Sequence, residues 1–287
     1  AHTLRLTGGE PLLSQRLLPL LEEVSRGRST PGDPMGGLRH IALTTNGVLL
    51  TPNRARLLRA AGLDRITISL DAVDGSVAAR MAGLRGGQAA GERLVRQVID
   101  GVMSAKLAGF VAEQGEIKLN AVIKKGENDS QVLPLAALAR RYGLELRLIE
   151  YMDVGNRNGW VADQVLPAAE MVRLIQARWP LQPLGRDSGA TANRWRFTDD
   201  RGGLGVIASI SEPFCGDCNR LRITADGQAF TCLFASEGTD LKPVLDNTAA
   251  LQQRIAGLWL HRSDRYSEER HHHLPRSSHA EMAYLGG

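Results

Sequence analysis

Short apolar runs alternate with helix-like segments through the first half of this 287-residue chain, and this order limits the folds open to it. The strand-like runs span residues 4–7, 40–45, 66–70, 117–123 and 144–150. The spacing of apolar residues predicts helices over residues 13–24, 51–62, 92–107 and 129–143. A strand–helix–strand order repeated in this way predicts a parallel sheet or barrel. The Gly- and Pro-rich stretch 26–37 is expected to form an exposed loop.

The pattern changes after Glu150. One helix is expected over residues 168–178, followed by short strands over 194–197, 205–211, 221–224 and 228–231. A Gly-rich turn at residues 199–203 separates the first two of these strands, as in an antiparallel pair. We therefore expect two domains, an α/β domain over residues 1–155 and a smaller α+β domain over residues 156–287.

The composition argues against several classes of protein. Thirty-five Lys and Arg face 31 Asp and Glu, and a net charge of only +4 gives no reason to expect nucleic-acid binding. The apolar runs are short and interrupted by charges, so no membrane-spanning segment is expected. All three cysteines lie between residues 215 and 232, which favours a metal site in a reducing cytoplasm over a disulfide framework.

Polar residues and glycines follow three of the predicted strands. The segments are Thr7-Gly8-Gly9-Glu10-Pro11, Thr45-Asn46-Gly47 and Ser69-Leu70-Asp71. In parallel barrels the loops that follow the strands form the active face, and the two adjacent glycines would let a ligand approach the backbone closely. Each segment taken alone could be an ordinary turn. Three of them at one face favour a binding site.

Lys118 and Arg147 lie on strands that are otherwise strongly apolar. A buried cation without a partner is costly, so an anionic ligand or a nearby carboxylate is expected. The alternative is a solvent-facing edge position, or an internal ion pair with Glu150 or Asp71.

The three cysteines are the sharpest chemical signal in the sequence. Cys215 and Cys218 are separated by two residues, and Cys232 follows after thirteen more. Two cysteines on a tight turn and a third from the next hairpin can bind one metal centre. A structural zinc ion would need a fourth ligand, such as His261, whereas a [4Fe–4S] cluster on three thiolates keeps one iron open. The spacing does not decide between them.

Two further segments carry concentrated polar chemistry. In Arg220-Leu221-Arg222 the two arginines share one face of a predicted strand, and paired guanidinium groups suit phosphate oxygens. A solvated strand face is the alternative. The histidines at positions 271–273 and 279 are expected to belong to a polar insertion in the tail rather than to a metal site.

Together these motifs resemble the molybdenum cofactor biosynthesis protein A family, the radical S-adenosylmethionine enzymes called GTP 3′,8-cyclases. The resemblance is carried by residues 4–12 (LRLTGGEPL), 44–47 (TTNG), 68–71 (ISLD), 149–156 (IEYMDVGN) and the three-cysteine block. It implies an incomplete parallel (β/α) barrel of the radical S-adenosylmethionine type, followed by a smaller C-terminal cluster domain. It also implies conversion of GTP to 3′,8-cyclo-7,8-dihydro-GTP, with a cyclic pyranopterin synthase acting on the product, and a homodimer is possible.

The resemblance also assigns roles to individual residues. Cys215, Cys218 and Cys232 would hold a [4Fe–4S] cluster whose open iron meets the guanine. GTP would be contacted by Arg5, Thr45, Lys118, Arg147, Arg220, Leu221 and Arg222. S-adenosylmethionine would be contacted by Gly9, Ser69 and Met152. No residue is singled out as catalytic beyond these binding roles.

One departure from the family pattern concerns a second cluster. The family carries a Cys-x3-Cys-x2-Cys motif before the GGEP strand, and this chain has no cysteine before Cys215. The sequence is therefore expected to be a family member that lacks its N-terminal segment, with the first barrel strand, and to be inactive on its own. Two alternatives remain open: another twitch- or SPASM-type radical enzyme, and a zinc- or cluster-stabilised nucleotide-binding module without radical activity.

Overall fold

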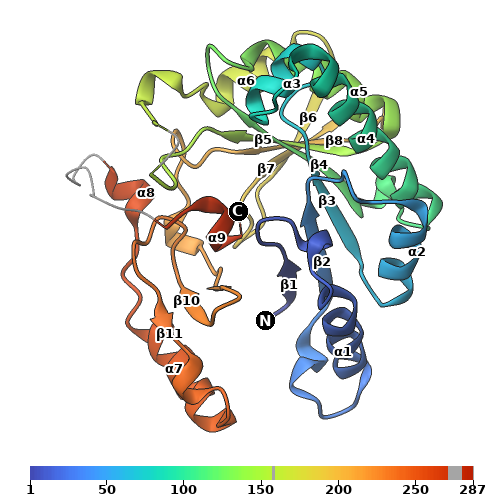
Figure 1. Ribbon diagram of the computed structural model, residues 1–287. Coiled ribbons are helices and arrows are strands. Elements are labelled where there is room, and N and C mark those ends of the chain that lie inside the picture. The colour runs from blue at the N-terminus through green and yellow to red at the C-terminus, as the bar shows by residue number, and fades with distance from the viewer. Residues whose placement is uncertain (157–158, 271–279, 287) are drawn as a thin grey trace.

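An open eight-stranded sheet forms the centre of the protein, as the computed structural model in Figure 1 shows; the structure describes residues 1–156, 159–270 and 280–286. Its first five strands are parallel: β1 (Thr3–Leu6), β2 (His40–Thr45), β3 (Arg65–Ser69), β4 (Ile117–Ile123) and β5 (Glu145–Glu150). The sheet then continues through β8 (Gly203–Ile207), β7 (Asn193–Phe197) and β6 (Leu181–Gly185). The predicted α/β class with a mostly parallel, unclosed sheet is confirmed.

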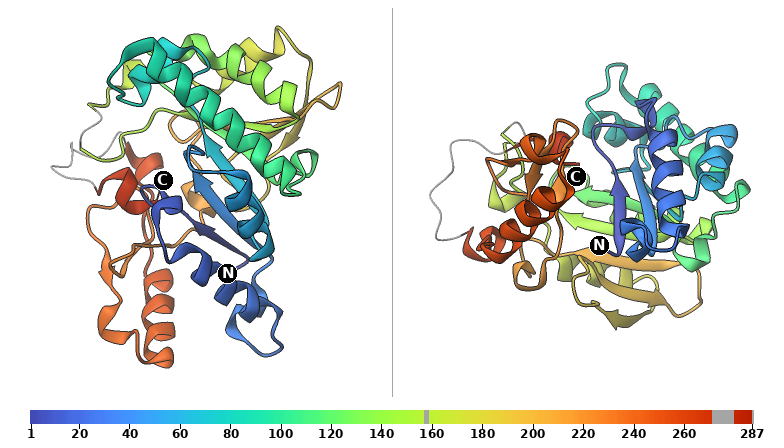
Figure 2. Two further views of the ribbon diagram at one scale, coloured as in Figure 1. Left: turned by 45° about the vertical axis from the view of Figure 1, so that its right-hand side comes forward. Right: turned by 90° about the horizontal axis from the view of Figure 1, so that it is seen from below.

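Helices cover the outer side of this sheet (Figures 1 and 2). They are α1 (Leu17–Ser29), α2 (Pro52–Ala60), α3 (Gly75–Met81), α4 (Gly87–Leu107), α5 (Val132–Tyr142) and α6 (Ala168–Gln176). The strands alternate, so that side chains such as Ile66 and Ile68 face the helices and are fully buried. Local signals fix the helix ends: Thr51 caps α2 by accepting a hydrogen bond from the Arg54 amide, and Pro52 follows at the first helical position.

The other face of the sheet is polar. Arg5 on β1 donates hydrogen bonds from Nη1 to the hydroxyls of Thr44 (2.8 Å) and Thr67 (3.2 Å) on the next two strands. Strand alternation places Lys118 and Arg147 on this same concave side. The sequence thus separates an apolar outer face, which packs on helices, from a cationic inner face.

Several predicted boundaries in the first half were wrong. The first helix begins at Leu17 rather than residue 13, because Glu10 caps a 3₁₀ turn over Pro11–Leu13. It also continues to Ser29, so the predicted loop over residues 26–37 starts too early. The helix expected from residue 92 begins at Gly87. Helix α3 was not predicted, because its Gly, Ser and Ala residues give little hydrophobic periodicity.

The second half contributes both to the large sheet and to a separate small one. Strands β6 to β8 extend the sheet of the first half, while β9 (Arg222–Ile223), β10 (Gln228–Phe230) and β11 (Thr239–Asp240) form an antiparallel sheet. Three helices follow: α7 (Thr248–Leu260), α8 (Tyr266–Glu269) and α9 (Met282–Leu285). The division into residues 1–155 and 156–287 stays a prediction. The tail histidines at 271–273 and 279 lie outside the described residues.

The C-terminal part lies opposite the concave face of the sheet (Figure 1). Helix α9 approaches the end of β1, and a Cβ atom on Gly286 would lie 2.5 Å from the Thr7 methyl group. Within the described residues, no helix combines the length and apolar character needed to cross a membrane.

Helices α3 and α4 touch through glycine. A Cβ atom on Gly91 would overlap the carbonyl oxygen of Gly75, and one on Gly75 would lie 2.8 Å from the carbonyl oxygen of Gln88. The two backbones therefore leave no room for a side chain at Gly75 or Gly91, and only glycine permits an approach this close.

The close contact predicts that a Gly→Ala change at Gly91 is destabilising, whereas the same change at Gly257, outside the contact, serves as a control. Gly91→Ala should lower the free energy of unfolding by about 1–3 kcal/mol, because the added methyl group must displace backbone. Gly257→Ala in α7 meets nothing within 4 Å and should raise it by about 0.5–1 kcal/mol. Urea denaturation of both variants checks the pair; equal stability of Gly91→Ala and the parent would contradict the close approach.

Candidate active site

A group of cations lies on the concave face around a single carboxylate. Glu145 accepts a hydrogen bond from Lys118 Nζ (2.8 Å) and another from Arg147 Nε (2.7 Å). The three side chains are 11–19% exposed. The expectation of a nearby carboxylate is confirmed, but the alternative that named Glu150 or Asp71 as the ion-pair partner of Lys118 or Arg147 was wrong. Glu145 stands beside Lys118 in the strand register, whereas Glu150 points to the opposite face of β5.

Arg5 and Arg65 enlarge this group, which we call the barrel cation group: Arg5, Arg65, Lys118 and Arg147. Arg65 on β3 contacts the ring of His40 (Nη2 to Nε2, 2.8 Å) instead of a carboxylate. An arginine can only donate, so His40 accepts through Nε2 and its ring is neutral. Burial and then the charge of Arg65 lower the pKa of His40, which agrees with this form.

The charges of this group are not balanced. Burial, followed by the charge of Arg147, lowers the pKa of Lys118 to about 8 despite Glu145 beside it. Burial, Arg147 and Arg65 lower the pKa of Arg5 to about 10. Burial alone would raise the pKa of Glu145, but Arg147 and Lys118 hold it below its usual value. Lys118 and Arg147 share Glu145, while Arg5 and Arg65 add two charges with no carboxylate of the described residues bonded to them. Such a group forms a site for a ligand with several negative charges.

The ends of the strands are organised by Glu10. Its carboxylate accepts hydrogen bonds from the Thr45 hydroxyl (2.7 Å) and the Asn46 amide (2.8 Å), which joins the ends of β1 and β2. Thr45 is buried, so its predicted contact with GTP stays a prediction.

Three residues predicted to contact S-adenosylmethionine lie at or just after strand ends. A Cβ atom on Gly9 would meet nothing within 4 Å, and Ser69 at the end of β3 is exposed. Met152 follows β5 by two residues and is half-buried. The space beside Gly9 is thus open, and the assignment of these three residues to S-adenosylmethionine stays a prediction.

The three cysteines are free thiols and half-buried. Burial raises the pKa of Cys232; the Phe234 amide opposes this rise, while the charges of Asp264 and Cys215 add to it. Within the described residues, no three His, Cys, Asp or Glu side chains converge closely enough to hold one metal ion. His261 is not a fourth ligand: it is exposed and its Nδ1 lies 2.8 Å from the Gly257 carbonyl oxygen.

Arginines surround the cysteines. Arg220 donates to Cys218 Sγ from Nη2 (3.0 Å) and Nε (3.3 Å), and Arg262 donates to the Cys218 carbonyl oxygen. Burial would raise the pKa of Cys218, but Arg220 holds it below its usual value and so favours the thiolate. Burial and Arg220 lower the pKa of Arg222 to about 10, while the Cys218 and Cys232 charges oppose this shift.

A zinc ion and an iron–sulfur cluster place different demands on the positions of the three thiols. A single zinc ion would need its thiolates about 3.8 Å apart, given Zn–S bonds of about 2.3 Å. A [4Fe–4S] cluster spreads its thiolates because each binds a different iron. Arg220 favours the thiolate form of Cys218, the form that binds iron, and the charges of Cys218 and Cys232 both act on Arg222. The chemistry of this donor set suits a cluster, whose thiolates need not converge on one point.

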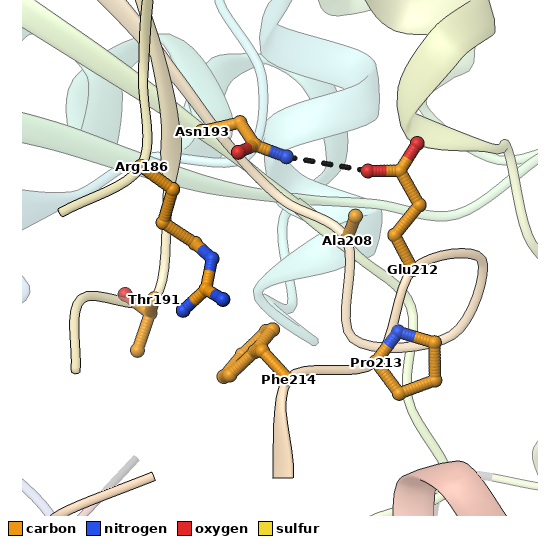
Figure 3. A pocket seen from close by; sticks show the side chains of 7 residues that line it. All are labelled: Arg186, Thr191, Asn193, Ala208, Glu212, Pro213 and Phe214. Carbon is orange, nitrogen blue, oxygen red and sulfur yellow. Dashed lines mark hydrogen bonds between the residues drawn. The ribbon is translucent and has the colours of Figure 1, made fainter. Parts of the chain in front are cut away.

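A cavity of about 250 Å³ lies next to the turn over residues 215–218, which we call the cysteine turn. Figure 3 shows the side chains around this cavity. It is lined by Arg186, Thr191, Asn193, Ala208, Glu212, Pro213 and Phe214. Arg186 also binds both carboxylate oxygens of Asp217 at 2.9 Å, between Cys215 and Cys218. A second cavity of about 240 Å³ opens at Cys232.

The structure thus brings the predicted residues together in two groups. Arg5, Lys118 and Arg147 lie on the concave face, whereas Arg220 and Arg222 lie beside the cysteines. No hydrogen bond or ion pair joins the two groups among the residues that the structure describes. Sequence reasoning missed Glu145, Arg65 and Arg262. Glu145 could have been found, because it shares a strand face with Arg147 two residues later.

Comparison with known proteins places both halves of the chain. Residues 1–139 match the Radical SAM superfamily, and residues 144–268 match Molybdenum Cofactor Synthesis C. A GTP 3′,8-cyclase of Synechococcus sp. (strain WH7803) is 68% identical over 286 residues, which cover 100% of this chain and 82% of that protein. The chain belongs to the GTP 3′,8-cyclase family.

More distant relatives agree with this membership. The GTP 3′,8-cyclase of Xanthomonas axonopodis pv. citri (strain 306) is 44% identical, over 99% of this chain and 79% of its own length. Among solved structures, Streptococcus suis SuiB has a TM-score of 0.55 at 13% identity, covering 96% of this chain and 59% of SuiB. SuiB bound to S-adenosylmethionine gives a TM-score of 0.54 at 14% identity, covering 99% of this chain and 61% of SuiB. At these identities SuiB supports the fold alone.

The lowered pKa of Lys118 predicts a pH-dependent anion affinity. Lys118 loses its proton as the pH rises from 7 to 9.5, because its pKa is about 8. Affinity for inorganic tripolyphosphate should then fall about tenfold, since one charge-assisted contact is lost. Calorimetry at the two pH values checks this. Lys118→Arg keeps its charge and should show a much smaller fall; equal falls in both proteins would exclude Lys118 from the anion site.

Proposed function

We propose that this chain binds GTP, the nucleotide that GTP 3′,8-cyclases convert to 3′,8-cyclo-7,8-dihydro-GTP in molybdenum cofactor biosynthesis. The observation that carries the proposal is the barrel cation group, four cations on the concave face of which, among the described residues, only Lys118 and Arg147 bond a carboxylate, the shared Glu145. A triphosphate supplies the several negative charges that this group lacks. The relatives named GTP 3′,8-cyclase supply the identity of the nucleotide.

The chain's own residues would divide the work of holding GTP. Lys118, Arg147 and Arg5 bind the triphosphate, and Glu145 orients the first two. Arg220, Leu221 and Arg222 contact the nucleotide on the side of the cysteines, where Arg220 already lies against Cys218. Thr45 adds a polar contact at the end of β2. Holding both ends of GTP fixes the ribose relative to the strand ends.

The cofactors follow from the superfamily, which implies a [4Fe–4S] cluster and S-adenosylmethionine. Cys215, Cys218 and Cys232 would hold such a cluster. Gly9, Ser69 and Met152 would line the S-adenosylmethionine site. When bound, these groups supply the radical chemistry, while the protein orients the nucleotide and excludes water. A homodimer and a cyclic pyranopterin synthase as the next enzyme belong to the same proposal, as does a reducing cytoplasm, which the free thiols suit.

The cluster assignment predicts the metal content. Anaerobic reconstitution should give one [4Fe–4S] cluster per chain, and Cys232→Ser should remove most of the bound iron because three thiolates are needed. GTP should change the electron paramagnetic resonance spectrum of this cluster. Iron and zinc analysis of protein purified without air checks the assignment. Bound zinc without iron would favour the alternative of a zinc-stabilised nucleotide-binding module.

The triphosphate assignment predicts the effect of removing one cation. Arg147→Ala should weaken GTP binding at least tenfold, because a charge-assisted contact contributes about 1.5–3 kcal/mol. Arg173→Ala removes an exposed arginine on α6 that pairs with Glu170, and it should leave binding unchanged. Calorimetric titration of the reconstituted protein checks both.

The same titration tests whether the base is recognised. GTP should bind more tightly than ATP, since both carry the same triphosphate and differ in the base. Equal affinities, or an unaffected Arg147→Ala variant, would count against the proposed function. The expectation that residues 1–287 alone form no 5′-deoxyadenosine stays a prediction for the same reconstituted protein.

A further inference from the structure

Glu150 occupies an unusual position for a carboxylate. It is the last residue of β5, and its side chain is fully buried. It faces away from the barrel cation group, because Glu145 and Arg147 occupy the other face of the strand. In the part of the chain that the structure describes, no Lys or Arg pairs with it. A buried charge of this kind is costly unless hydrogen bonds satisfy it.

Four donors satisfy both oxygens of Glu150. One oxygen, Oε1, accepts from the Ala168 amide (2.7 Å) and the Ser211 hydroxyl. The other, Oε2, accepts from the amides of Ile210 (2.7 Å) and Ser211 (2.9 Å). Every partner donates, and an ionised carboxylate is the form that accepts at all of these positions. Ala168 is the first residue of α6, whose N-terminus also favours a negative charge.

These bonds join three separated segments. They tie the end of β5 to the start of α6 and to the segment after β8 that runs into Cys215. Ile210 and Ser211 precede Cys215 by only a few residues. Ala208 before them and residues 212–214 after them line the cavity in Figure 3. On the other side, Met152 follows Glu150 by two residues. One carboxylate therefore links the barrel strand to the approach to the cysteine turn.

We propose that Glu150 is a positioning residue that fixes the cysteine turn relative to the barrel. Its carboxylate accepts three hydrogen bonds from Ile210 and Ser211, and these bonds fix the position of the segment over residues 208–214. The position of this segment in turn determines where Cys215 lies. The Arg186–Asp217 pair holds the same turn from the β6–β7 side, so the turn is tied at two points. The consequence for a cluster rests on the proposed function, whereas the anchoring of the segment does not.

Glu150→Gln is the direct test, because it preserves size but replaces one acceptor with a donor. The new amide must face N–H groups on one of its two sides, so part of the anchor is lost. Hydrogen–deuterium exchange of a peptide covering residues 208–214 should become at least tenfold faster in the unreconstituted protein. After anaerobic reconstitution, the cluster should show a broadened electron paramagnetic resonance spectrum or lower iron content.

Two further variants separate anchoring from general stability. Ser211→Ala removes one of the four donors and should give a smaller acceleration confined to the same peptide; it carries the test should Glu150→Gln not fold. Arg140→Gln removes the buried arginine of the Arg140–Asp199 ion pair. It should lower the free energy of unfolding without speeding up hydrogen exchange over residues 208–214.

The outcomes are distinct. Unchanged exchange over residues 208–214 in Glu150→Gln and Ser211→Ala, or the same loosening in Arg140→Gln, would overturn the proposal. Loosening with an unaltered cluster spectrum would also overturn it, because the turn would then not depend on the anchor. If the parent protein binds no iron but Glu150→Gln still loosens the segment, the anchor stands and the proposed function fails.

Discussion

The concave face of the sheet depends on one carboxylate shared by two cations. Without Glu145, the side chains of Lys118 and Arg147 would stand together, largely buried and facing Arg5. Such an arrangement is unfavourable, since like charges at short range raise the free energy of the folded state. Glu145 makes it tolerable but does not neutralise it. The apolar outer face, packed on the helices, supplies the stability that permits a face of this kind.

The parts of this arrangement differ in how far the sequence predicts them. The five parallel strands follow from short apolar runs, and α2 follows from its Thr51-Pro52 start. The start of α1 does not, because it depends on Glu10 reaching the Leu12 amide to cap a preceding turn. Helix α3 was missed because its contact with α4 is made by glycine backbone, which leaves no hydrophobic pattern to detect.

The candidate site shows the same limit. Lys118 and Arg147 stand out because they are charged residues on apolar strands. The partner of Arg147 lies two residues earlier on the same strand, whereas that of Lys118 is set by strand register, which the sequence does not state. Glu150 was considered as an ion-pair partner for Lys118 or Arg147 and as part of a family motif, whereas its four donors come from α6 and from a segment about 60 residues further along. Contacts between segments this far apart in the sequence cannot be predicted until the order of the strands in the sheet is known. Arg220 was predicted toward phosphate, and the structure adds its contact with Cys218.

The surplus of positive charge on the concave face also bears on handling the protein. Any small multivalent anion that binds the folded state but not the unfolded one stabilises it, and the effect grows with the logarithm of the anion concentration once this exceeds the Kd. Sulfate or phosphate in a buffer would therefore be drawn to Arg5, Lys118 and Arg147 and would compete with a nucleotide there. Purification in a chloride or acetate buffer leaves the face clear, at the cost of some thermal stability. The choice of buffer anion is thus part of any measurement made on this face of the sheet.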